Sequence, residues 1–330
     1  MSDDEPANRM RERSTQSTVA LYLLLDADRR YVTAGIVALV FFALVGVSLA
    51  VPGAGVALRS SDSVDTAFQA LIGGTITGVT LVLTLNQLVL SQELGAVGDQ
   101  RERMDGAIAF QEAVRDLVGE TPPAEPSGFL QAMIDETADR ARAVSESGPL
   151  EEALEAMVEG TVENAEVVHE RLDGADFGEF EVVRAALDFN YSWKLHVTRR
   201  SLDDGDCSAA TRESLAALAE SLRLFGPARE HFKTLYFQSE LIGLSRTVLY
   251  AAVPSLAAAI SVVFFFDAER YTGTILAVDT GVWLVSAAVA VAVLPFAVLL
   301  AYVLRIATVT KRTLSIGPFI LRETDRDTGR

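Results

Sequence analysis

The chain of 330 residues is half hydrophobic and carries 45 Asp and Glu against 28 Lys and Arg, a formal net charge of −17. It is too apolar for an ordinary acidic soluble protein, and it lacks the basic surface that nucleic-acid binding requires, so we expect no nucleic-acid partner. Its single cysteine excludes an internal disulfide and a cysteine-rich metal site.

The lysines are few, and the charge excess is acidic. This composition is typical of proteins from salt-accumulating halophiles, because charge repulsion is screened when the Debye length falls to about 3 Å in molar salt. The acidic net charge therefore indicates adaptation to a salty solvent rather than a particular binding partner.

The first 30 residues predict a cytosolic N-terminal segment. Its apolar stretch at 17–28, STVALYLLLDAD, is too short to cross a bilayer. We expect a helix there that either lies at the membrane surface or docks on the cytosolic domain.

Four uncharged apolar runs are long enough to span a membrane. Two fall within 31–91, at 31–51 and 66–91, and two fall within 247–304, at 247–266 and 282–304. Pro254 and Pro295 predict kinks in the last two spans, which a lipid-embedded helix tolerates. No acidic or basic side chain lies inside a span, which disfavours an ion-coupled pump.

The distribution of cations predicts the orientation. Arginines crowd the N-terminal segment and the basic tail at 305–330, whereas each short loop between spans holds one, Arg59 or Arg270. The positive-inside rule therefore predicts a multi-pass plasma-membrane protein with both termini in the cytoplasm.

Residues 92–246 predict an acidic cytosolic helical domain, with 31 acidic against 15 basic side chains. Apolar residues recur at helical spacing in two seams, and breaks at 121–127, 147–149, 174–178 and 203–208 imply about five helices. The seams are Leu150, Leu154, Met157, Thr161, Ala165, Val168 and Leu172, and Leu215, Leu218, Leu222 and Phe225. The fold class we expect is all-α.

The second span carries a stripe of polar or small residues at steps of three or four positions. At about 100° per residue the stripe occupies one face roughly 80° wide. Such a face in hydrocarbon needs another helix, a symmetry mate or water. Its members are Thr66, Gln69, Gly73, Thr77, Thr80, Thr84, Gln87 and Ser91.

The stripe has two interpretations, which can coexist in an oligomer. It can line a pore, since hydroxyls and amides exchange with the water around an ion, or it can be a packing seam, aided by the small pair Gly74 and Gly78. Glu93 and Glu240 lie within two turns of the predicted cytosolic edge, where they would ring a pore mouth or simply be solvated.

Other polar clusters favour structural roles. Asp203, Asp204 and Asp206 lack the further ligands of a calcium loop, and Cys207 has no evident base partner. The aromatic and basic stretch at 189–200 could stack a nucleotide but is more typical of a helical core. We therefore expect no enzyme activity, no cofactor and no metal.

The run at 83–104, LTLNQLVLSQELGAVGDQRERM, resembles a segment of haloarchaeal membrane proteins of unknown function. That resemblance implies a salt-adapted archaeal membrane. The layout of two spans, a helical domain and two spans is similar to bestrophin-type channels, whose second helix lines the pore; here Thr77, Thr80 and Thr84 stand where that family has apolar gating positions.

These observations predict a homo-oligomeric passive ion channel or pore in the lipid bilayer, lined by the second span. The alternative is a non-conducting membrane scaffold or sensor, in which the stripe is a packing seam and the acidic domain binds a cytosolic protein partner.

Overall fold

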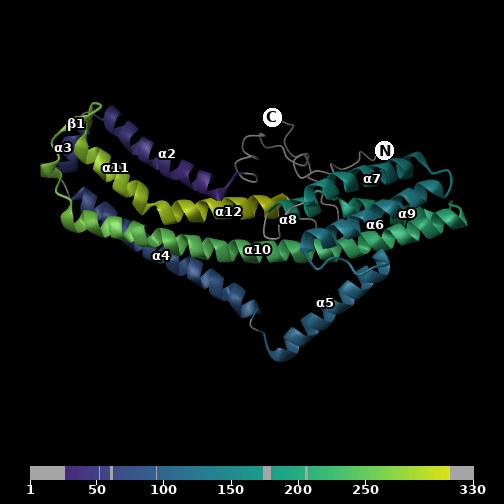
Figure 1. Ribbon diagram of the computed structural model, residues 1–330. Helices are drawn as coiled ribbons and strands as arrows, with labels where there is room; N and C mark the ends of the chain where they lie inside the picture. The colour runs from purple at the N-terminus through teal and green to yellow at the C-terminus, as the bar shows by residue number, and fades with distance from the viewer. Residues whose placement is uncertain are drawn as a thin grey trace. The chain divides into compact units, whose positions relative to one another are not determined.

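The computed structural model describes residues 27–51, 53–59, 62–93, 95–173, 180–204 and 207–312. The described chain is almost wholly helical (Figure 1), as the sequence predicts, and it divides into two compact units. Nearly all of the expected surface helix at 17–28, and the tail beyond 312, lie outside the described residues. We call residues 27–93 and 238–309 the apolar unit, and residues 95–237 the acidic unit.

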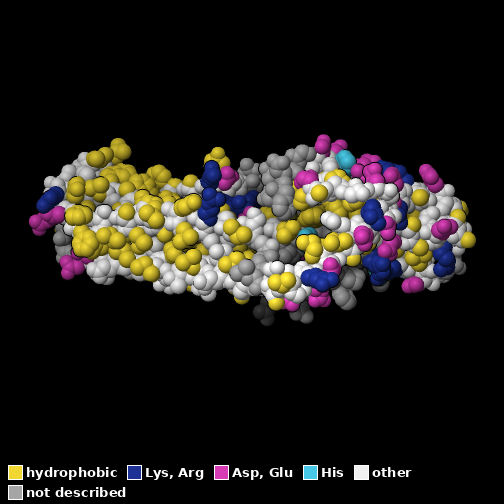
Figure 2. All heavy atoms as spheres, turned by 60° about the horizontal axis from the view of Figure 1, so that its bottom comes forward, with side chains coloured by type: hydrophobic (Ala, Val, Ile, Leu, Met, Phe, Trp, Pro, Cys, Tyr) yellow, Lys and Arg dark blue, Asp and Glu magenta, His cyan; other side chains and the backbone are white. Residues whose placement is uncertain are grey.

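The apolar unit contains the helices that are able to span a membrane. They are α2 (Arg29–Ala50), α4 (Ser63–Glu93), the second half of α10 (Ala209–Phe265), α11 (Thr280–Ala292) and α12 (Leu294–Arg312). Between them lie α3 (Ala54–Arg59), a 3₁₀ turn η2 (Ala268–Arg270) and the short hairpin β1 (Thr274–Ile275) and β2 (Val278–Asp279). Hydrophobic side chains cover much of this unit's visible face, and charged side chains gather at the two ends of that surface (Figure 2).

Three described helices, α2, α4 and α10, are long and apolar enough to cross a membrane, and the pair α11 and α12 makes a fourth candidate. The two members of that pair meet at a bend of 47°. Pro295 lies in the first turn of α12 and has no N–H to continue α11, so the predicted kink is a break between two helices.

At the break, the backbone carbonyl of Ala292 has no helical partner, and a side chain from a neighbouring helix donates a hydrogen bond to it. The hydroxyl of Ser255 on α10, itself fully buried, donates to the backbone oxygen of Ala292 at 2.7 Å. A buried carbonyl without a partner is costly in hydrocarbon, so this contact compensates for the bond that the helix loses at its bend.

Helix α10 runs without a break through 57 residues, from the acidic unit into the apolar unit. The sequence suggested a domain limit at 246, because the composition changes there from polar to apolar. A change of composition does not require a change of backbone geometry, and the helix continues through Gly226 and Pro227 as well as through Arg246.

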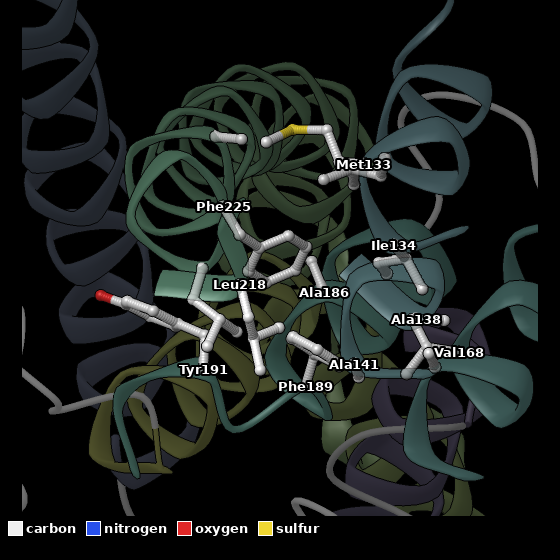
Figure 3. Packing of buried hydrophobic residues seen from close by; sticks show 14 of the residues in the cluster. Met133, Ile134, Ala138, Ala141, Val168, Ala186, Phe189, Tyr191, Leu218 and Phe225 are labelled. Atoms are coloured by element: carbon white, nitrogen blue, oxygen red, sulfur yellow. The ribbon is translucent and has the colours of Figure 1, made fainter. Parts of the chain in front are cut away.

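The acidic unit packs α5 (Val97–Val118), α6 (Pro126–Glu146), α7 (Glu152–Leu172), α8 (Phe180–Leu187) and α9 (Tyr191–Asp204) with the first half of α10. Both predicted apolar seams are in its core: Leu154 to Leu172 on α7 and Leu215 to Phe225 on α10. Figure 3 shows Leu218 and Phe225 of α10 directed toward Phe189 and Ala186. The described residues give six helices rather than about five, because a turn at 188–190 separates α8 from α9.

Candidate functional site

Helix α4 carries the polar stripe on the face that points away from its own unit. All eight stripe residues, from Thr66 to Ser91, are exposed. The buried residues of α4 are Phe68, which packs with Ala259 and Ala292, and Val82, which packs with Leu244, Val248 and Val298. At about 100° per residue the centre of the stripe lies roughly 160° around the helix from these two side chains. No other described part of the chain covers the stripe.

The hydroxyls of the stripe bond to their own helix. Thr77 donates to the carbonyl of Gly73, Thr80 to that of Ile76 and Thr84 to that of Thr80, each at 2.9 Å. Ser91 donates to the carbonyl of Leu88 at 2.7 Å. Each of these hydroxyls has used its one donor, so it presents only oxygen lone pairs to whatever covers the face.

The two amides of the stripe behave differently. Gln69 and Gln87 are exposed, and within the described residues their side-chain amides make no hydrogen bond. They are 18 positions apart, or about 27 Å along a helix, which is close to the roughly 30 Å thickness of a bilayer core. Thr77, Thr80 and Thr84 of the stripe lie between these two amides.

Gly74 and Gly78 border a groove of about 260 Å³ rather than a close helix contact. In the described part of the chain, no atom of another helix lies within 4 Å of where a Cβ would stand at either position. The side of the groove opposite α4 is walled by apolar residues at the bend between α11 and α12, including Pro295 and Phe296, and by Val248 of α10. Close packing through these glycines stays a prediction, for contacts between copies of the chain.

Glu240, a candidate for either a pore mouth or a solvated boundary, is only 6% exposed and forms an ion pair with Arg29. The guanidinium of Arg29 also stacks over the ring of Tyr302, 4.7 Å from its centroid. Sequence reasoning missed this cluster because its three residues come from α2, α10 and α12 and share no motif. Glu93 ends α4, and its side chain lies outside the described part, so its place at a mouth stays a prediction.

The remaining candidates of the sequence belong to the acidic unit. Lys194 is fully buried and lies over the ring of Phe189, 5.2 Å from its centroid, in agreement with a core role for the aromatic and basic stretch. Asp203 and Asp204 are exposed at the end of α9, while Asp206 is outside the described residues. Within the described residues, no group of three or more His, Cys, Asp and Glu side chains is placed to hold a metal ion.

Comparison with known proteins identifies a family for this chain but no activity. No curated protein and no solved structure matches the chain. One family profile matches residues 1–329, which is nearly the whole sequence. The chain therefore belongs to DUF7972, a family of unknown function.

Proposed function

We propose that this protein is an integral plasma-membrane protein with four spans, formed by α2, α4, the second half of α10 and the pair α11 and α12. The lengths and hydropathies of these helices support this placement. The concentration of arginine in the N-terminal segment and the tail supports cytoplasmic termini and a cytoplasmic acidic unit.

Its function is that of a homo-oligomeric passive ion channel, with copies of α4 around the axis. One observation carries this proposal: the continuous polar face of α4 is turned away from every helix of its own unit. A single helix cannot enclose water, so the pore requires several subunits. Thr77, Thr80, Thr84 and Gln87 would face its axis.

The chemistry of the face favours cations. The donors of Thr77, Thr80 and Thr84 are bound to backbone carbonyls, so their free lone pairs are the groups available to replace water around an ion. Oxygen lone pairs attract cations and repel anions. We therefore expect monovalent cations to pass more readily than chloride.

A second uncovered surface supports assembly. In the acidic unit, residues 97–109 of α5 are all exposed, and Val97, Met104 and Ile108 are large apolar side chains among them. Apolar side chains on an otherwise polar helix gain stability when a neighbouring subunit covers them.

The alternative is a non-conducting scaffold or sensor, and the hydroxyl bonds of the stripe favour it. Because the threonines satisfy their own donors, the face also tolerates lipid or a close helix contact without water. In that case α4 is a packing seam, and the acidic unit binds a cytosolic protein.

The first test is the detergent-corrected mass of the full chain in molar KCl, measured by light scattering on a sizing column. An assembly of four or more subunits supports the channel. A monomer or dimer that persists across detergents contradicts it, because too few copies of α4 would be present to enclose a pore.

The second test is flux through reconstituted Thr80→Leu/Thr84→Leu protein. The channel hypothesis expects reduced cation flux with assembly intact, and Thr80→Ser/Thr84→Ser, which keeps both hydroxyls, should conduct. A matched control, Leu81→Val/Leu85→Val, changes exposed residues beside the stripe and should leave flux unchanged. Loss of assembly in the leucine pair would instead favour the scaffold, and unchanged flux would remove the stripe from the pore.

A further inference from the structure

A groove of about 880 Å³ opens in the apolar unit among α2, α10 and α12. Its lining is divided into a polar and an apolar part. Asp28, Arg29, Arg30 and Tyr250 contribute to the polar part, and Val37, Ala251, Pro254, Leu294 and Val298 contribute to the apolar part. The volume is within the range of about 300–1,000 Å³ typical of ligand sites.

The polar part carries a surplus of positive charge. Arg29 and Arg30 line the groove, Arg246 contacts the hydroxyl of Tyr250 at 3.4 Å, and Arg305 donates to the backbone oxygen of Ala27 at 3.5 Å. Among the residues that the structure describes, two carboxylates contact this group of four arginines and their helix end. Glu240 pairs with Arg29, and Asp28 caps α2 by accepting from the backbone N–H of Arg30 at 2.8 Å.

Two groups at this end are suited to bind an anion. Arg30 is exposed, and within the described residues its guanidinium makes no ion pair. The Tyr250 oxygen accepts from Arg246, which leaves its own O–H to donate. A guanidinium and a phenol at the polar end of an apolar groove are the groups that recognise a phosphate attached to a hydrocarbon chain.

We propose that this groove binds one anionic phospholipid. The phosphate contacts Arg30 and Tyr250, and an acyl chain follows the apolar lining past Ala251 and Val298 toward the bilayer centre. A free phosphate would leave that apolar lining without a partner, and a zwitterionic lipid would bring a second cation to a site that is already basic. In the proposed orientation the lipid belongs to the inner leaflet.

This inference rests on the membrane placement proposed above and is independent of a pore. The full chain is reconstituted in vesicles with equal amounts of dioleoyl phosphatidylglycerol and dioleoyl phosphatidylcholine. The vesicles are washed at alkaline pH, and the protein is then extracted in mild detergent. The lipid retained per protomer is quantified by mass spectrometry. Release of the protein by the wash would refute the membrane placement itself.

We expect wild-type protein to retain more phosphatidylglycerol than phosphatidylcholine. Each arginine that contacts the phosphate should raise the ratio of the two lipids about fivefold, the equivalent of ~1 kcal/mol per basic side chain. Arg30→Gln should lower this preference about fivefold, and Tyr250→Phe, which keeps the ring, should lower it in the same direction. Arg270→Gln is the matched control, because Arg270 is an exposed arginine that follows the other end of the same α10 span.

Three results would overturn the proposal. The first is equal retention of both lipids by a protein that stays in the washed vesicles. The second is displacement of phosphatidylglycerol by inorganic phosphate at similar concentration, which would indicate an anion site without a lipid. The third is phosphatidylglycerol retention that appears only after residues 1–25 are deleted, since the chain's own N-terminal segment would then be the occupant.

Discussion

The hydrogen bond from Ser255 to Ala292 makes a measurable contribution to stability at the bend between α11 and α12. In an unbroken helix the oxygen of Ala292 would accept from the N–H of Phe296, and the bend at Pro295 removes that partner. The Ser255 hydroxyl replaces it at 2.7 Å. When Pro295 is present, Ser255→Ala should therefore leave the buried carbonyl of Ala292 without a hydrogen-bond donor.

Ser255→Ala should lower the free energy of unfolding by about 1–2 kcal/mol. Hydrogen bonds between membrane helices contribute roughly 0.6 kcal/mol on average, and a buried polar group without a partner costs ~1–3 kcal/mol. In a Pro295→Ala background the helix can close over the bend and supply the Phe296 N–H. The same serine substitution should then cost under about 0.5 kcal/mol, which leaves a coupling of order 1 kcal/mol.

Reversible unfolding in mixed SDS micelles measures both costs. The chain has two tryptophans, so a Trp193→Phe background leaves Trp283 of α11 as the fluorescent reporter. Ser261→Ala is the control, because that hydroxyl bonds to its own helix at Ala257 and is exposed. Equal costs of Ser255→Ala with and without Pro295 would refute the claim that the serine compensates for the break.

Two further substitutions test local features outside the spans. Ala277 is exposed at a left-handed φ of 64°, so Ala277→Gly should stabilise the hairpin by up to about 1 kcal/mol and raise the Tm; a lower Tm would contradict the assigned strain. The Ser127 hydroxyl, with the backbone N–H groups of Gly128 and Ser127, holds the pKa of Glu125 below its ordinary value of 4.5. The stabilisation from that carboxylate should be complete above about pH 4.5 and lost as the pH falls through the lowered pKa. Glu125→Gln should remove this part of the acid sensitivity in thermal unfolding, and an unchanged pH profile would contradict the assignment.

Much of the helical structure could be predicted because its signals are local. Uninterrupted apolar runs predicted the helices α2, α4 and α10 that are long and apolar enough to cross a membrane, and recurring apolar positions predicted the buried seams of α7 and α10. The proline in the last apolar run predicted the position of the bend, because the missing N–H of Pro295 removes one helical hydrogen bond. Pro254 removes one as well, yet α10 continues through it without a break.

Features that depend on tertiary contacts could not be predicted. The sequence shows that the α4 stripe shares one face, but only packing shows that Phe68 and Val82 turn that face away from the unit. Glu240 was expected at a solvent boundary, yet Arg29, 211 positions earlier in the chain, pairs with it. The continuity of α10 was missed because the composition changes from polar to apolar near residue 246, and a change of composition does not end a helix.

The self-bonded threonines of α4 have a consequence for how an assembly could switch. Hydrating or drying this face leaves the hydrogen bonds that Thr77, Thr80 and Thr84 donate in place, since each donor stays on its own helix. In the proposed pore, Gln69 and Gln87 at the two ends would keep contact with water in both states. Drying the central section would then remove only the bonds that water donates to the threonine oxygens. Small changes in spacing between neighbouring copies would then be enough to fill or empty it, without any side chain changing its rotamer.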